Sequence, residues 1–186
     1  MIDYLKSKAN INLQSVEVLR SFIKTTARLK GELLFEQGKL CDRIFFIKEG
    51  FARIYYISED GKDITELFVP QKNYSTPMSS FIPGEISQVS CELLEDSIVS
   101  ELTQKDLNVL VNYDHELSKV AFSALREITS LTIQLIRNLK FLSAKEKYDA
   151  LIAQTPNIFQ RVPAVHIASY LGTTPETLSR IRAEKE

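Results

Sequence analysis

The spacing of hydrophobic residues changes at Asp114, and this change limits the possible folds more than any other feature of the chain. Between residues 31 and 102, apolar side chains occur in short runs rich in Ile, Phe and Tyr, separated by glycine turns such as Asp60-Gly61. Such runs are typical of an antiparallel β-sandwich or barrel. From Asp114 onward, apolar residues follow a helical period for almost thirty residues. The sequence therefore predicts an α+β protein in which one long helix follows a β-domain.

The β-domain can be divided into strands at its turn signals. Asp60-Gly61 is a hairpin signal because glycine tolerates a positive φ. The stretch from Pro70 to Glu95 holds further prolines and a glycine, so we expect mostly loops there. Helical spacing of apolar residues over residues 12–29 predicts a helix before the β-domain. The expected strands are Leu33–Phe35, Ile44–Ile47, Phe51–Ile57, Ile64–Val69 and Ile98–Leu102.

The long helix, residues 114–142, repeats apolar side chains at alternating steps of four and three, as a coiled-coil seam does. A second apolar row, which includes Leu125 and Ile136, lets the helix pack on its own β-domain and on a partner helix at once. A single buried helix in a monomer is the alternative. Small Ala121 and Ala124 favour the dimer because they allow close helix approach. The predicted dimer interface consists of Leu117, Ala121, Ala124, Ile128, Leu131 and Leu135.

Residues 143–186 carry the most specific motif. Ser143 and Glu146 have the spacing of a capping box and begin a helix. Near the end of the chain, Gly172 ends one helix, Thr174 caps the next, and Pro175 occupies its first position. This is the spacing of a helix-turn-helix. Its predicted packing residues are Ala168, Gly172, Leu178 and Ile181.

The last helix presents polar residues on its outer face. An arginine there can read guanine and a glutamate can read cytosine, while Thr and Ser side chains can hold phosphates. A plain helical hairpin with a solvated outer face is the alternative. The predicted DNA-binding residues are Thr174, Glu176, Thr177, Ser179, Arg180 and Arg182.

Charge is distributed unevenly, although the whole chain has a net charge of only −1. Residues 1–53 carry +4, residues 54–125 carry −8, and residues 126–186 carry +3. The middle segment contains no arginine. The basic end permits contact with DNA, but specific affinity would depend on dimerisation and a few arginines.

Several segments resemble the Crp/Fnr superfamily of bacterial transcription regulators, most closely its members from Bacteroidetes-type bacteria. The similar segments are Gly31–Gly38, Ile44–Arg53, Asp60–Lys62 and the ending, with Ile167–Gly172 followed by Thr174–Arg182. The resemblance implies a cyclic-nucleotide-binding-type β-roll (a jelly roll) in residues 1–113, a dimerisation helix in 114–142 and a DNA-binding domain in 143–186. It also implies that Glu176 and Arg180 contact bases. Where the family often has an arginine, this chain has Pro175.

The resemblance places an effector pocket in the β-roll, but this chain departs from the family there. Nucleotide-binding members carry a glycine-glutamate pair followed by an arginine that grips the cyclic phosphate. No arginine is present from residue 54 to residue 125, and a buried phosphate needs such a charged partner. We therefore expect no tight binding of cyclic AMP. The predicted pocket residues are Gly84, Glu85, Ser87 and Gln88.

Other chemistries find little support in the sequence. Cys41 and Cys91 are too few to hold an iron–sulfur cluster, and no histidine lies between residues 1 and 114 to form a cupin-type metal site. No apolar run approaches the length of a membrane span. We therefore expect no cofactor, no metal, no enzymatic activity and no membrane contact.

The sequence predicts a cytoplasmic, homodimeric transcription regulator that binds a palindromic site in double-stranded DNA. Its further expected partners are an unidentified small-molecule effector and RNA polymerase. The alternative is a ligand-binding or protein-interaction module that does not bind DNA. A cupin-type metalloenzyme is a third, weaker alternative.

The predicted seam can be tested by Leu131→Glu. A carboxylate at the centre of an apolar helix interface should break the dimer, because burying an unpaired charge is costly. Sedimentation velocity should then show a monomer in place of the wild-type dimer. An unchanged sedimentation coefficient would contradict the assignment of Leu131 to the interface.

Overall fold

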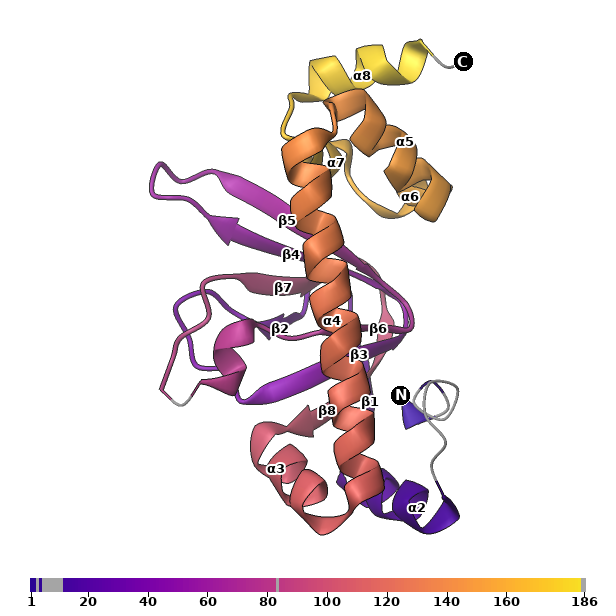
Figure 1. Cartoon of the computed structure of the whole chain (residues 1–186). Helices are drawn as coiled ribbons and strands as arrows, with labels where there is room; N and C mark the ends of the chain where they lie inside the picture. Colours follow the sequence, from indigo (N-terminus) through magenta and orange to yellow (C-terminus); the bar gives the residue numbers. More distant parts are fainter. Residues whose placement is uncertain (3, 5–11, 83, 185–186) are drawn as a thin grey trace.

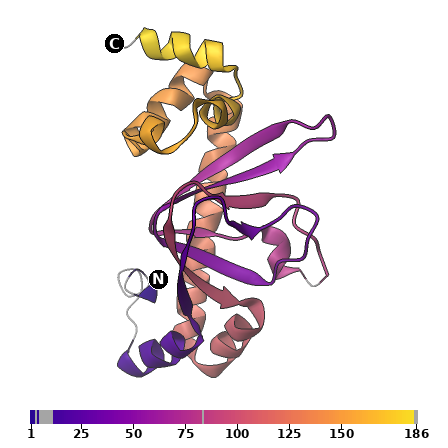
Figure 2. The ribbon, with the colours of Figure 1, turned by 180° about the vertical axis from the view of Figure 1, so that it is seen from behind.

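The computed structural model describes residues 1–2, 4, 12–82 and 84–184. A β-domain of two sheets occupies the middle of the molecule, and the long helix α4 (His115–Phe141) runs along it from end to end (Figure 1). Helices α2 (Leu13–Phe22) and α3 (Gln104–Tyr113) lie at one end of α4. Four shorter helices lie at the other end. Seen from behind, the sheets lie in front of α4 along most of its length (Figure 2).

Both sheets of the β-domain are antiparallel and four-stranded, with strand orders β1-β8-β3-β6 and β2-β7-β4-β5. Apolar side chains from their facing sides form a shared core that includes Phe45, Ile47, Val69 and Leu93. The first sheet contains β1 (Lys24–Arg28), β8 (Ser97–Thr103), β3 (Arg43–Glu49) and β6 (Asn73–Ser75). The second contains β2 (Leu33–Phe35), β7 (Ser90–Leu93), β4 (Phe51–Ile57) and β5 (Asp63–Pro70).

The helix expected over residues 12–29 is wrong in its second half. Asn12 caps α2, but this helix ends at Phe22, and Lys24–Arg28 forms strand β1. Two consecutive β-branched residues, Thr25 and Thr26, favour the extended backbone, and all five residues of β1 pair with β8. Pairing with a strand seventy residues away therefore overrides the helical spacing.

Four elements within or just after the β-domain were not expected from the sequence. The stretch read as loops contains the short strands β6 and β7 and a single 3₁₀ turn, Met78–Phe81. The glutamate of β7 interrupts its apolar run, but β7 is held between β2 and β4. Helix α3 directly precedes α4, and Thr103 caps it by accepting a hydrogen bond from the Asp106 amide.

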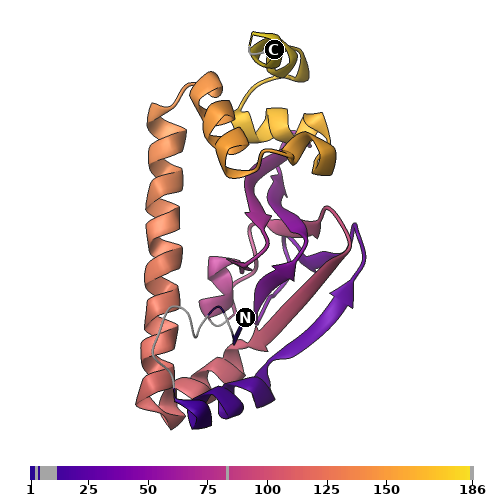
Figure 3. The same cartoon turned by 90° about the vertical axis from the view of Figure 1, so that its right-hand side faces the viewer.

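The long helix begins and ends where the sequence predicts. Asp114 caps α4 by accepting a hydrogen bond from the Glu116 amide, and the helix continues for 27 residues. Its first turns pack against α2, α3 and β8 in a core that includes Leu19, Leu102 and Leu110. Figure 3 shows α4 as a rod that meets α2 and α3 at one end and leads into the C-terminal helices at the other.

Leu117 belongs to this intrachain core and not to a surface that a partner could reach. Its exposed fraction is 3%, and it packs with Leu110 and Val120. Its assignment to the dimer interface is therefore wrong, because the folded chain already buries it.

The C-terminal helices pack on one another and on the β-domain. The capping box at Ser143 is present, with Glu146 completing it. One continuous core joins Leu151 and Ile158 of these helices with Phe51 and Phe68 of the β-domain. The four helices are α5 (Ala144–Gln154), α6 (Ile158–Arg161), α7 (Ala164–Leu171) and α8 (Pro175–Ala183).

Gly50, in the turn between β3 and β4, should tolerate no side chain. Its φ is +116°, and a Cβ there would lie 2.6 Å from the Ser97 Cβ. We expect Gly50→Ala to lower the free energy of unfolding by about 3 kcal/mol, from backbone strain and overpacking together. Urea denaturation measures this change.

Gly61→Ala is the matched control. Gly61 has a φ of +80°, but a Cβ there would meet nothing within 4 Å. It should cost only about 1 kcal/mol, the usual cost of a left-handed residue. Equal losses for the two variants would show that contact with Ser97 is unimportant.

Candidate DNA-reading helices and effector cavity

A tight turn sets the angle between α7 and α8. Gly172 ends α7 in the left-handed region, with φ 69° and ψ 35°, and the Thr173 amide donates to the Ala168 carbonyl at 3.0 Å. Thr174 then caps α8 by accepting a hydrogen bond from the Thr177 amide at 3.3 Å. Ala168 is buried together with Leu178 and Ile181, where the helices meet. Local sequence signals and packing therefore agree at this turn.

The residues proposed to read DNA lie on or next to α8. Glu176, Ser179 and Arg180 are exposed, while Thr177 is half-buried. Arg180 donates a hydrogen bond to the Thr177 hydroxyl at 3.1 Å, and a hydrogen bond with Thr174 lowers the pKa of Glu176, which is therefore ionised near neutral pH. The outer face thus carries one carboxylate and one guanidinium a single turn apart.

Arg182 is placed differently from Arg180. Its guanidinium lies 5.0 Å from the centre of the Phe159 ring of α6, a cation–π distance. At the same end of α8, Lys145 of α5 forms an ion pair with Glu184 at 2.8 Å. These contacts tie the end of α8 to α5 and α6, so α8 is held at its end as well as at its turn.

A cavity of about 630 Å³ lies between the second sheet and α4. Strands β4 and β5 contribute Ile54 and Leu67 to its wall, and α4 contributes Ile128, Leu131 and Leu135. Helices α5 and α7 close one end of the cavity with Ala150, Ala153 and Tyr170. A molecule bound there would touch the β-domain, the long helix and the C-terminal helices together.

The polar groups of this cavity are mostly uncharged. Its described lining residues include no lysine, arginine or histidine, and Glu127 is the only carboxylate among them. Tyr4 donates a hydrogen bond to Glu127, which raises the pKa of Tyr4 further above the ordinary tyrosine value than burial alone does. The Tyr74 hydroxyl is buried with no hydrogen-bond partner among the described residues. The lining therefore suits a largely apolar, uncharged molecule better than an anion.

The residues predicted to form the effector pocket, Gly84, Glu85, Ser87 and Gln88, do not line this cavity, and their role stays a prediction. Ser87 is buried because its backbone pairs with the segment after β2: the Ser87 amide donates to the Lys39 carbonyl at 2.9 Å. The other three residues are exposed. The cavity was missed because its walls come from alternate residues of strands and from a helix far along the chain.

A second, more apolar groove of about 470 Å³ lies nearer the start of α4. Ala121, Ala124 and Ile128 line it, as do Phe81 and Leu107 of the β-domain and α3. Ile128 belongs to both hollows, so the row of α4 that was predicted to face a partner also faces its own β-domain.

Arg53 is not available to bind an anion in either hollow. It is 4% exposed, and its guanidinium pairs with Asp63 at 2.6 Å and with Glu92 at 2.9 Å. Burial lowers the pKa of Arg53, but the two carboxylates outweigh it and raise the pKa above its ordinary value. The guanidinium is therefore a fixed, permanently charged group inside the protein.

Among the described residues, no group of three or more potential metal ligands comes together. The described helices also include none that is long and apolar enough to cross a membrane.

Comparison with known proteins gives the class of the β-domain. Residues 28–114 match the cyclic nucleotide-binding domain family. The transcriptional activator protein Anr of Pseudomonas protegens is 26% identical over 189 residues, covering 92% of this chain and 75% of its own. The β-domain is thus similar to cyclic nucleotide-binding domains, and the chain as a whole is similar to a transcriptional activator.

Solved structures share the fold at low sequence identity. FixK2 of Bradyrhizobium japonicum has a TM-score of 0.70 at 16% identity, covering 87% of this chain and 83% of that chain. The regulator CLP of Xanthomonas campestris, described as responsive to c-di-GMP, has a TM-score of 0.71 at 12% identity, covering 93% of this chain and 91% of that chain. The arrangement of β-domain, long helix and C-terminal helices is therefore that of these regulators.

Proposed function

We propose that this protein is a sequence-specific, DNA-binding transcription regulator that acts as a homodimer in the cytoplasm. The observation that carries the proposal is the outer face of α8, where ionised Glu176 and Arg180 lie exposed one turn apart on a helix capped by Thr174. In this reading α7 and α8 form a helix-turn-helix, and α8 enters the major groove. Arg180 would donate to guanine and Glu176 would accept from cytosine.

Homodimerisation is supported by a row of α4 that the single chain leaves uncovered. Phe122 is 67% exposed, Leu125 48% and Ile136 56%, and helical spacing places this row beside the one that lines the cavity. A second copy with its own α4 in parallel would cover both rows. Two α8 helices could then enter successive major grooves about 34 Å apart on a palindromic site.

The effector domain of this regulator is proposed not to bind cyclic AMP. A cyclic phosphate needs a cation in its site, and the described lining of the cavity between the second sheet and α4 includes no lysine, arginine or histidine. Arg53 is committed to Asp63 and Glu92. An uncharged effector fits this domain better than cyclic AMP does. RNA polymerase is proposed as a further partner of the protein.

Titration calorimetry with cyclic AMP tests this part of the proposal. We expect no saturable heat at ligand concentrations up to about 1 mM, a limit that corresponds to a binding free energy weaker than about −4 kcal/mol. A midpoint of thermal unfolding that stays constant as cyclic AMP is added would agree, because a ligand that binds the folded state raises it. Saturable binding in the micromolar range would contradict the proposal.

Selection of binding sites from genomic DNA fragments tests the main proposal. Purified protein should enrich fragments that share a palindrome with half-sites one helical turn apart. The competing function, a ligand-binding or protein-interaction module, predicts no enriched sequence and no salt-dependent affinity for any duplex.

Arg180→Ala should weaken binding to the selected duplex by about 1–3 kcal/mol and relax the preference at one base pair. Fluorescence anisotropy with duplexes varied at each position measures both effects. Arg20→Ala is the matched control, because Arg20 is an exposed arginine on α2, at the opposite end of the molecule (Figure 1). If Arg180→Ala bound every duplex as the wild type does, Arg180 would not be a base-reading residue.

A further inference from the structure

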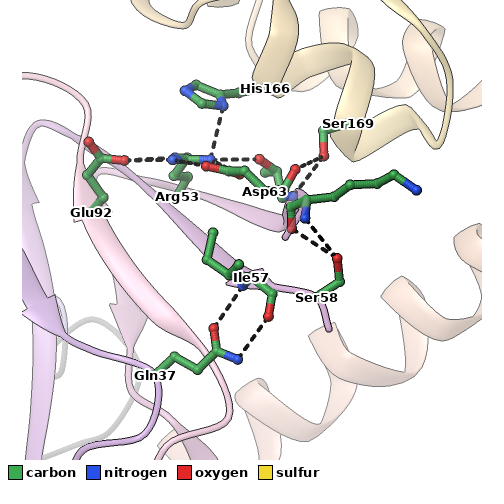
Figure 4. A network of polar contacts seen from close by, with 10 residues as sticks. Gln37, Arg53, Ile57, Ser58, Asp63, Glu92, His166 and Ser169 are labelled. Carbon is green, nitrogen blue, oxygen red and sulfur yellow. Dashed lines mark hydrogen bonds and ion pairs between the residues drawn. The ribbon is translucent and has the colours of Figure 1, made fainter. Parts of the chain in front are cut away.

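Helix α7 is docked on strand β5 by polar contacts that no part of the proposed reading of DNA requires. The guanidinium of Arg53 lies 3.0 Å from Nδ1 of His166, and the Thr65 amide donates to the Ser169 hydroxyl at 2.9 Å. Ser169 in turn donates to the Asp63 carbonyl at 3.1 Å. Figure 4 shows His166 and Ser169 pointing from α7 toward the two strands. We call this set the Arg53 cluster: Arg53, Asp63, Thr65, Glu92, His166 and Ser169.

Arg53 is the fixed member of the cluster. Its two terminal nitrogens donate to the two carboxylate oxygens of Asp63 at 2.6 and 2.8 Å, and its Nε donates to Glu92 at 2.9 Å. Its guanidinium also lies 4.0 Å from the centre of the Tyr55 ring. Held on these sides, it cannot turn away if the group opposite it changes charge.

His166 can complete this arrangement in only one protonation state. An arginine offers donors and no acceptor, so Nδ1 must carry a lone pair, and the imidazole must be neutral. A protonated His166 would lose this hydrogen bond and place a second cation against Arg53. The facing carboxylates of Asp63 and Glu92 would attract that cation, but both are already engaged by Arg53.

We propose that the Arg53 cluster is a proton-sensitive latch, in which neutral His166 holds α7 against β5 and protonation of His166 releases this contact. The release is local. Tyr170 stays packed on Phe68, with ring centres 5.2 Å apart, and Arg161 stays paired with Glu95 at 2.6 Å. The helices therefore remain attached to the β-domain while the edge of α7 that carries His166 and Ser169 moves.

The latch bears on function because α8 packs on α7 through Leu178 and Ile181. A movement of α7 carries α8 with it and alters the separation of the two reading helices in a dimer. This consequence rests on the proposed function, whereas the latch itself does not.

The direction of the pH effect follows from the surroundings of His166. Burial lowers the pKa of His166 below its ordinary value near 6.5, and the charge of Arg53 lowers it further, against the opposing effect of Asp63 and Glu92. Because the pKa of His166 is lower in the docked state than in the released state, docking is favoured while His166 is neutral. The latch is therefore intact above about pH 6.5 and weakens as the pH falls below that value.

Hydrogen exchange of the Thr65 amide reports directly on the latch, since this amide donates across the contact to Ser169. Measured by NMR on the full chain and corrected for intrinsic exchange, its protection factor should fall by up to about tenfold between pH 6.5 and 5.5. The amide of Leu93, bonded to the Glu32 carbonyl inside the β-domain, should not change.

The variant His166→Asn separates the latch from other titrations. The asparagine oxygen can accept from Arg53 as Nδ1 does, so Thr65 should stay protected and lose its pH dependence. The chain has only one other histidine, the exposed His115, and His115→Asn should keep the wild-type pH dependence. In the wild type, the pKa of the His166 ring should lie below the ordinary histidine value.

Three outcomes would overturn the proposal. First, the protection factor of the Thr65 amide in the wild type could be the same at both pH values. Second, His166→Asn could keep the pH dependence, which would assign that dependence to the carboxylates. The pKa of the His166 ring could also prove to be at or above the ordinary histidine value. None of these measurements uses DNA, so their failure would leave the proposed regulator untouched, and a failure to bind DNA would leave the latch untouched.

Discussion

The packing of the first turns of α4 against α2, α3 and β8 is the interaction on which the rest of this structure depends. At one end, its first turns share a core with α2, α3 and β8, and at the other end the chain continues directly into α5. A helix of 27 residues is about 40 Å long, enough to pass the whole β-domain. Packed at its first turns and continuous with α5 at its other end, α4 lines one side of the cavity and connects the β-domain to the C-terminal helices.

The buried charge of Arg53 is the second constraint, and it acts across the boundary between the domains. A buried guanidinium is tolerated only when it is fully paired, and Asp63 and Glu92 pair it from two strands of the same sheet. The remaining face of the cluster is closed by His166 of α7. The β-domain and helix α7 therefore meet at a group that must stay charged.

Much of the fold follows from signals that are local in the sequence. The turn at Gly61, the caps at Asp114 and Ser143, and the turn from Gly172 to Thr174 each depend on residues within a few positions of one another. The polar face of α8 could be predicted for the same reason. Strand β1 and strand β7 could not, since neighbours in the sheet hold them against weak or contrary local preferences.

The sequence by itself determined most of the elements, their order and the polar residues of the last helix, because capping, turn conformation and hydrophobic period act over a few residues. The tertiary structure decided which side chains contact one another and which are buried. It buried Leu117 in its own chain, placed the cavity away from Gly84 and Glu85, and brought His166 to Arg53 across 113 positions. A contact between residues so far apart in the sequence depends on where α4 places the C-terminal helices relative to the β-domain. The packing of whole elements sets that placement, and no local pattern does.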